Sequence, residues 1–301
     1  MSKMSKKIVF FGSGPVAAAS LALLSKDFEI EAVLTKPQPA HHKQPFPVLS
    51  LAKERGLRIL TASSQEELST VLKENDLKSD LGIIIDHGII ISHDVIEHFP
   101  LGIINSHFSL LPRWRGADPI SFSILNGDRE TGVSLMVIVD RLDEGNLLVQ
   151  RHLPIAPTAT TPSLTDELIA LSHAMLVETI PLYRAGKVAP YPQPDEPPTY
   201  SHKLSKADGT IDWHKSATQL EREIRAYSGW PRSRTRLGSI DVTVTAAHVV
   251  PASGTAGKLL IENQQLGIYC GQDMLILDRL IPSGKKEMPV NSFLNGYQLE
   301  S

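Results

Sequence analysis

Residues 7–24 read "KIVFFGSGPVAAASLALL", and this stretch decides the fold of the first half of the chain. An apolar run, a glycine turn and an Ala/Leu-rich segment in succession indicate a buried strand that leads into a helix. Further apolar runs follow at residues 28–35, 57–62, 81–86 and 101–105. Strands with such continuous apolar runs are buried on both faces, which is typical of a parallel sheet. We therefore expect an α/β fold with a Rossmann-like, mostly parallel sheet in the N-terminal domain.

The second part of the chain has a different composition. A long amphipathic helix should begin near Pro162 and end at Gly186, and residues 187–200 then hold five prolines. Such a segment cannot be helix interior and suits a stiff connector. Short alternating segments follow at near-regular spacing, which favours a small β-barrel. We predict three parts: a Rossmann-like catalytic domain over residues 1–186, a proline-rich linker over 187–205, and an OB-like β-barrel over 206–301.

Bulk composition excludes several classes of protein. A chain of 301 residues with 42% hydrophobic content can bury one or two cores, so disorder is not expected. The net charge of −3 argues against a protein that coats a polyanion, although a local basic patch could still contact a nucleic acid. The single cysteine, Cys270, excludes a disulfide scaffold and a cysteine-rich zinc site. Because no apolar run suits a signal peptide or a membrane span, we expect a soluble cytoplasmic protein with no membrane partner.

The glycine turn at residues 12–17, "GSGPVA", fits the G-x-G-x-x-A pattern of dinucleotide-binding proteins in the required strand-turn-helix context. That fingerprint also needs an acidic residue at the end of the second strand. Here the strand ends in Thr35 and Lys36. A non-catalytic dinucleotide-binding protein is therefore a disfavoured alternative. The turn could instead present a helix N-terminus to another anion, or its glycines could only allow close packing of helix and strand.

Residues 104–120 read "INSHFSLLPRWRGADPI" and place an amide and an imidazole on one strand. Asn105 and His107 are two residues apart, so their side chains project from the same face at the carboxyl end of the strand, where α/β enzymes bind ligands. An amide donor and a ring that changes charge near neutral pH could together hold an oxyanion. The next apolar strand is followed by Asp143 and Glu144, and a carboxylate beside the ring would stabilise its charged form.

Other chemistries fit these residues less well. A single histidine is more often structural than catalytic, so His107 alone decides little. The pair His41 and His42 lacks metal-ligand spacing, and we expect no metal. Ser106 and Ser109 lack the G-x-S-x-G elbow of serine hydrolases.

Residues 104–120, together with "NGDRETGVSLMVIVDRLDEGNLL" at 126–148, closely resemble the signature region of the methionyl-tRNA formyltransferase family. The segments "TYSHKLSKADGTIDW" at 199–213, "AYSGWP" at 226–231 and "GKKEMPVNSFLNG" at 284–296 resemble the linker and C-terminal domain of that family. The resemblance covers nearly the whole chain. It implies transfer of a formyl group from 10-formyltetrahydrofolate to the methionine amino group of initiator methionyl-tRNA, in support of translation initiation.

The resemblance also assigns residues and partners. The catalytic group of the family falls on Asn105, His107 and Asp143. The residues expected to contact folate are Ser109, Leu110, Leu111 and Pro112, with Asp86, His87 and Gly88 as second contacts. Folate and initiator methionyl-tRNA are the expected substrates, the C-terminal domain is the expected tRNA-binding part, and a monomer is expected.

The chain departs from the family pattern at two places. The loop at residues 36–47 is shorter and less basic than usual, so Lys36, His41, His42 and Lys43 would have to substitute for it. At the second place, His87 replaces the aromatic residue that the family has before the glycine of its pterin loop.

The chain from residue 206 onward is nearly neutral, with 11 Lys and Arg against 10 Asp and Glu, so local clusters would have to contact the tRNA phosphates. The clusters are Arg232, Arg234 and Arg236; Lys285 and Lys286; and Arg113 and Arg115.

Two rival enzymes would keep the folate chemistry and change the acceptor. A sugar-nucleotide N-formyltransferase would share the Asn-His-Asp group, and a hydrolase would transfer the formyl group to water. The segment at residues 284–296 counts against the sugar-nucleotide enzyme, and the tRNA-type second domain counts against the hydrolase.

Overall fold

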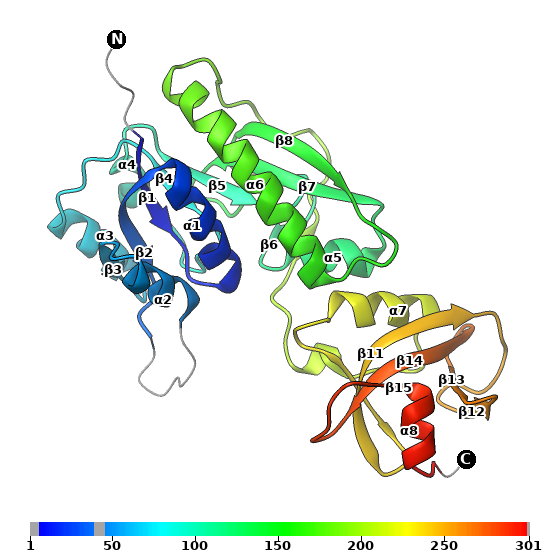
Figure 1. Cartoon of the computed structure of the whole chain (residues 1–301). Helices are drawn as coiled ribbons and strands as arrows, with labels where there is room; N and C mark the ends of the chain where they lie inside the picture. Colours follow the sequence, from blue (N-terminus) through cyan, green and yellow to red (C-terminus); the bar gives the residue numbers. More distant parts are fainter. Residues whose placement is uncertain (1–5, 39–45, 300–301) are drawn as a thin grey trace. The chain divides into compact units, whose positions relative to one another are not determined.

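The computed structural model describes residues 6–38 and 46–299, and His41, His42 and Lys43 of the predicted tRNA-contacting loop therefore lie outside it (Figure 1). The chain forms two compact units. The first comprises Met1–Gly116, Thr131–Leu153 and Thr165–Tyr200, and the second comprises Ala117–Glu130, Pro154–Leu164 and Ser201–Ser301. The predicted domain limits at residues 186 and 205 remain predictions beside this grouping.

The first half of the chain builds a seven-stranded sheet in the order β3-β2-β1-β4-β5-β7-β8. The first five strands in this order pair in parallel, and β7 runs antiparallel to β5. The strands are β1 (Lys7–Phe11), β2 (Glu29–Thr35), β3 (Ile59–Thr61), β4 (Gly82–Ile84), β5 (Ile103–His107), β7 (Glu130–Val137) and β8 (Leu147–Pro154). The helices are α1 (Pro15–Asp27), α2 (Pro47–Glu54), α3 (Gln65–Glu74), α4 (His93–Glu97) and α6 (Thr161–Arg184). The prediction of a mostly parallel sheet is confirmed.

The glycine turn after β1 allows strand and helix to approach closely. A Cβ on Gly12 would lie 2.6 Å from the Cβ of Ala17 and 2.8 Å from the carbonyl oxygen of Ile85. Only glycine fits this position, because real Cβ atoms do not come that near to other heavy atoms. Pro15 then begins α1, where its missing N–H costs no helical hydrogen bond.

Helix α6 begins and ends where the sequence predicts. At its start Thr160 and Ser163 cap each other, since the Thr160 N–H donates to Ser163 Oγ at 3.0 Å and the Ser163 N–H donates to Thr160 Oγ1 at 3.4 Å. At its end Gly186 has a φ of 64°, and its N–H donates to the carbonyl of Tyr183. This left-handed cap favours glycine and stops the helix.

The second unit is built on an antiparallel sheet, as expected of the C-terminal part. Its order is β10-β11-β14-β13-β12, and β15 pairs with β14. The strands are β10 (Ser233–Leu237), β11 (Ile240–Val250), β12 (Leu259–Glu262), β13 (Gln265–Tyr269), β14 (Met274–Pro282) and β15 (Met288–Pro289). Helices α7 (Ala217–Ala226) and α8 (Val290–Gly296) close its core with Leu220, Ile224 and Phe293. Helix α5 (Pro119–Asn126), which the sequence pattern did not predict, packs on α7.

Candidate active site

Strand β5 places the predicted amide and imidazole at the carboxyl end of the parallel strands. It lies between β4 and β7, with Asn105 opposite Ile84 on one side and Met136 on the other. Asn105 is half-buried, whereas His107 is only 7% exposed. The two side chains therefore lie at the sheet edge where ligands of α/β enzymes bind.

Asp143, from the loop between β7 and β8, meets both side chains. Asn105 Nδ2 donates to Asp143 Oδ1 at 3.3 Å, and His107 Nδ1 lies 3.7 Å from Asp143 Oδ2. The backbone N–H of Gly116 donates to the same Oδ2 at 2.8 Å. Asp143 is 7% exposed and has a φ of 53°, so a left-handed backbone turns its carboxylate into the group. The structure thus brings the three predicted catalytic residues together.

The other nitrogen of His107 is held by the backbone of Trp114. His107 Nε2 donates to the Trp114 carbonyl oxygen at 2.9 Å, and because a carbonyl only accepts, Nε2 carries hydrogen. The Nδ1 edge then faces Asp143 across a distance too long for a hydrogen bond. A substrate atom placed beside this pair of groups would be within hydrogen-bond reach of both.

Trp114 is a residue of the site that sequence reasoning did not single out. Its φ is 56°, a conformation that costs a bulky residue about 1–3 kcal/mol and persists only when neighbours fix it. Its N–H donates to Thr199 Oγ1 at 2.9 Å, and the Arg113 guanidinium lies 4.5 Å from the centre of its ring. The contribution of Trp114 to the site is a backbone carbonyl, which no side-chain pattern could reveal.

Of the two acidic residues that the sequence offers to His107, the structure selects Asp143. Glu144 instead pairs with Arg115 Nη1 at 3.2 Å and with Arg141 Nη1 at 3.6 Å. The side chain of Arg115 is mostly buried and also donates to Gln193 Oε1 at 2.8 Å. Arg115 therefore supports the Asp143 loop.

The segment predicted to contact folate, Ser109 to Pro112, is fixed against β7 and β8. Ser134 Oγ donates to the carbonyl of Ser109 at 2.6 Å and accepts from the N–H of Leu111 at 3.1 Å. Gln150 Nε2 donates to the Leu111 carbonyl at 2.9 Å. Ser109, Leu111 and Pro112 are buried, and Leu110 is half-buried. Leu110 is therefore the member of this segment whose side chain is most accessible to a ligand.

Asp86 follows β4 and lies against the glycine turn at the start of α1. Its carbonyl accepts from the N–H groups of Ser13 and Gly14, and a Cβ on Gly14 would lie 1.8 Å from Asp86 Oδ2. The Asp86 carboxylate therefore packs at the N-terminus of α1, where the sequence predicted that an external anion could bind. Asp86, with a φ of 47°, and Gly88 are exposed, and both could contact a ligand.

His87, between them, is buried beneath the surface. Its ring packs edge-on against Phe11 at 5.7 Å, and neither ring nitrogen has a hydrogen-bond partner within residues 6–38 and 46–299. Burial, and to a lesser extent the charge of Lys36, lower the pKa of His87 to about 4. Lys36 Nζ donates to the Gly88 carbonyl at 2.7 Å. His87 therefore acts as an uncharged aromatic ring that packs in the core.

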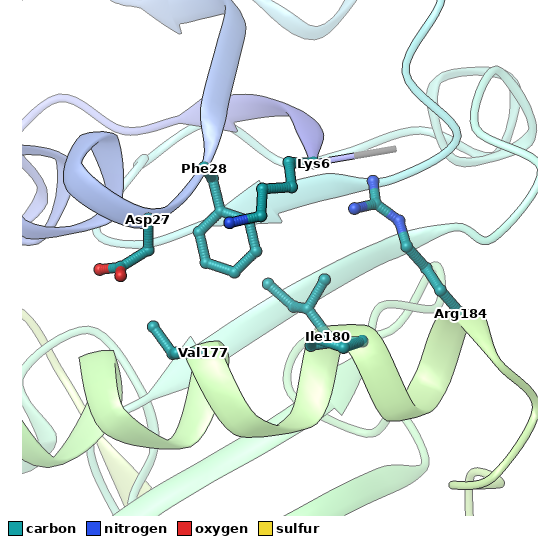
Figure 2. Close-up of a pocket in the computed structure, with 7 residues that line it drawn as sticks. Lys6, Asp27, Phe28, Val177, Ile180 and Arg184 are labelled. Atoms are coloured by element: carbon teal, nitrogen blue, oxygen red, sulfur yellow. The ribbon is translucent and has the colours of Figure 1, made fainter. Parts of the chain in front are cut away.

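A cavity of about 200 Å³ lies at the opposite end of β1, away from this group. Figure 2 shows Val177, Ile180 and Arg184 of α6 facing Asp27 and Phe28. The floor is apolar, and the Arg184 guanidinium is committed to Asp80 and the Lys7 carbonyl. None of the predicted site residues lines this cavity.

The basic residues of the second unit differ in how freely they are presented. Arg232 and Arg236 are exposed, as are Lys285 and Lys286, whereas Arg234 is half-buried and donates to the Lys206 carbonyl.

Within the described residues, no group of three or more His, Cys, Asp or Glu side chains could hold a metal ion. No helix among the same residues has the length and apolarity needed to cross a bilayer.

Comparison with known proteins places this geometry in a family. Residues 6–180 match the family model described as formyl transferase, and residues 203–298 match the formyl transferase C-terminal domain. The chain belongs to the formyltransferase family. Within that family it is 36% identical to the methionyl-tRNA formyltransferase of Roseiflexus castenholzii, over 98% of this chain and 97% of that protein. It is also 36% identical to the methionyl-tRNA formyltransferase of Pseudoalteromonas translucida, over 96% of this chain and 94% of that one.

Solved structures share the fold of this formyltransferase at lower identity. An N-formyltransferase from Helicobacter canadensis, solved with folinic acid and dTDP-3-aminofucose, has a TM-score of 0.68 at 17% identity and covers 95% of this chain and 100% of that one. HypX from Aquifex aeolicus has a TM-score of 0.63 at 16% identity and covers 98% of this chain and 49% of that one. The formyltransferase therefore shares its fold with both of these proteins.

Proposed function

We propose that this formyltransferase transfers a formyl group from 10-formyltetrahydrofolate to the methionine amino group of initiator methionyl-tRNA, in the cytoplasm, at the start of translation. The observation that carries the proposal is the meeting of Asn105, His107 and Asp143 at the carboxyl end of β5. The identity to methionyl-tRNA formyltransferases over nearly the full chain supports the choice of acceptor.

The reaction requires two opposite charges to be stabilised. Attack of an amine on a formamide-like carbonyl places negative charge on the carbonyl oxygen while positive charge develops on the attacking nitrogen. Asn105 Nδ2, which gives one N–H to Asp143, has a second N–H for that oxygen. His107, anchored through Nε2 and protonated on Nδ1, supplies the other donor. Removing one oxyanion donor costs about 10²–10³ in rate in other enzymes.

Asp143 has two roles in this scheme. Its carboxylate lies 3.7 Å from His107 Nδ1 and stabilises the charged ring. It also accepts one proton, directly or through a water, from the amine as the new C–N bond forms, and this proton balances the one that the folate nitrogen takes up as its bond to the formyl carbon breaks. The Gly116 N–H that donates to Asp143 Oδ2 holds the carboxylate in place for both roles.

The folate co-substrate fits beside this group. The exposed residues Asp86 and Gly88 offer polar contacts, and the half-buried Leu110 offers an apolar one. We propose that the pterin ring lies between the segment of residues 86–88 and the segment of residues 109–112. The ring of His87 takes no direct part, because it is buried against Phe11.

The acceptor assay tests the proposed function. Purified protein is supplied with 10-formyltetrahydrofolate and, separately, with charged initiator tRNA, uncharged tRNA or an amino-sugar nucleotide. We expect formyl transfer to the charged tRNA alone. Transfer to the sugar nucleotide would contradict the proposal in favour of a sugar N-formyltransferase, and release of formate without any acceptor would indicate a hydrolase.

A further inference from the structure

Residues 189–200 contain the prolines that led the sequence analysis to expect a simple linker, and nearly all of their side chains are exposed. Two side chains, Gln193 and Thr199, are half-buried instead. The backbone of this segment is held as well, because Tyr191 exchanges two hydrogen bonds with Leu147, at 2.7 and 2.9 Å. The segment therefore runs along the start of β8, directly after the loop that carries Asp143.

Gln193 uses its whole amide on the loops of the candidate active site. Its Nε2 donates to the carbonyl oxygen of Asp143 at 2.7 Å and to that of Gly145 at 3.0 Å. Its Oε1 accepts from Arg115 Nη2 at 2.8 Å. One side chain thus ties the Asp143 loop to the loop that follows β5.

Thr199 holds the other loop in the same way. Its Oγ1 accepts from the N–H of Trp114 at 2.9 Å, and its carbonyl accepts from the N–H of Arg115 at 2.9 Å. Its own N–H donates to the carbonyl of Pro112 at 3.3 Å. These bonds surround Trp114, whose positive φ needs outside support and whose carbonyl receives His107 Nε2.

We propose that residues 191–199 form a strap over the catalytic group, in which Gln193 and Thr199 are positioning residues for His107. Gln193 fixes the backbone of Asp143, which faces His107 Nδ1, and Thr199 fixes the backbone of Trp114, which binds Nε2. Each edge of the imidazole is thereby set by one strap residue. The inference rests on the proposed catalytic roles of Asn105, His107 and Asp143.

A segment that served only as a spacer would not need these contacts. Asp195 and Glu196, in the same stretch, show the ordinary behaviour of polar linker side chains, since both are exposed. An error of about 1 Å in the placement of a catalytic group can cost about 100-fold in rate. The hydrogen bonds from Gln193 and Thr199 to the backbone of the two loops should therefore affect the rate of turnover directly.

The test compares Gln193→Leu, Thr199→Val and Thr199→Ser with Asp195→Asn as the matched control from the same segment. We expect Gln193→Leu and Thr199→Val to lower kcat by about 10- to 100-fold with KM for the formyl donor unchanged. Thr199→Ser keeps the Oγ acceptor and should restore turnover. Equal losses in Thr199→Ser and Thr199→Val, or turnover in Gln193→Leu and Thr199→Val equal to that of Asp195→Asn, would overturn the proposal.

A second readout is independent of the acceptor. Two-bond ¹H–¹⁵N spectra of the full chain report which ring nitrogen of His107 carries hydrogen, with a His107→Gln variant to assign the signals. In spectra recorded at a pH where the ring is uncharged, we expect the Nε2–H form in the unaltered protein and a mixture of tautomers in Thr199→Val. If formyl transfer to tRNA is absent even from the unaltered protein, the proposed function fails, and the spectra still decide on the strap. An unchanged His107 spectrum in Thr199→Val would contradict it.

Discussion

His87 shows how burial changes the behaviour of one residue. The pKa of its ring falls to about 4 in the folded chain, mainly through burial, against about 6.5 for an exposed histidine. The unfolded chain therefore binds more protons between these values, and folding loses stability as the pH falls through that window. Above about pH 6.5 both states are uncharged at this position, and His87 has no effect on the pH dependence.

We predict that His87→Phe removes this acid sensitivity. In the unaltered protein the unfolding free energy should fall by about 2 kcal/mol from pH 7 to pH 5, because His87 is protonated in the unfolded chain and not in the folded one. Phenylalanine keeps the edge-on contact with Phe11 and has no charge to acquire. Urea unfolding of both proteins at the two pH values measures the difference. An equal decrease in both would show that other groups cause the acid sensitivity.

At the residue level the sequence could predict the catalytic group Asn105, His107 and Asp143 but not the backbone contacts that hold it in place. Asn105 and His107 follow from the period of a strand. The position after the next strand offered both Asp143 and Glu144, and the resemblance to the family selected Asp143. The left-handed backbone of Trp114 carries no signal in residue type, because tryptophan is not a residue that favours a positive φ. The sequence also could not show that Asp86 packs at the start of α1, since that contact depends on the turn after β4.

At the scale of elements, the end of α6 is fixed to the sheet by one arginine. Arg184 Nε donates to Asp80 Oδ1 at 3.1 Å, and Nη2 contacts the same oxygen and the carbonyl of Lys7. The side chain of Arg184 is only 5% exposed. Helix α6 is thereby attached to the beginning of β1 and to the residues before β4, beside the cavity in Figure 2.

We predict that Arg184→Met lowers the unfolding free energy by about 2–3 kcal/mol, because the carbonyl and carboxylate lose a charged donor. Arg184→Lys keeps a single charge and should lose less, since it cannot form the forked contact. Chemical denaturation of the three proteins measures both effects. Stability of Arg184→Lys equal to that of the unaltered protein would show that the forked geometry has no role, and equal losses in Arg184→Met and Arg184→Lys would show that a single charge at this position does not stabilise the fold.

Most elements follow from hydrophobic period and capping signals, and the exceptions have physical reasons. Helix α5 was not predicted because residues 119–126 are mostly apolar without a clear polar face, and five of them are buried. The segment of residues 191–199 reads as a linker because its prolines dominate the pattern. Its contacts with the site are made by two side chains on backbone groups distant in the sequence, and no local period reports such contacts.

At the scale of the whole molecule, charge placement has to serve tRNA binding. The net charge is −3, and the exposed members of the predicted basic clusters in the second unit are Arg232, Arg236, Lys285 and Lys286. We predict that affinity for charged initiator tRNA falls steeply with added salt, and that Arg236→Ala reduces the slope of log K against log salt by about 1. Filter binding over a salt series measures both, with Lys258→Ala as a second surface variant. A flat salt response would contradict tRNA as the acceptor.

The match to the family extends over both halves of the chain, and we propose a different role for each half. The first unit holds the candidate active site, and the second offers exposed cations on an antiparallel sheet. The sequence predicted both fold types from apolar period and strand spacing. The domain limits at residues 186 and 205 and the expected monomer remain predictions.

The most direct test of the account is the effect of Asn105→Ala and His107→Ala on single-turnover formyl transfer and on folate affinity, measured in the same preparations. If the two residues donate to the developing oxyanion, each substitution should slow transfer by about 10²–10³ while the dissociation constant for the folate changes little. Matched losses in rate and folate affinity would contradict the account, because they would mean that Asn105 and His107 only shape the folate pocket.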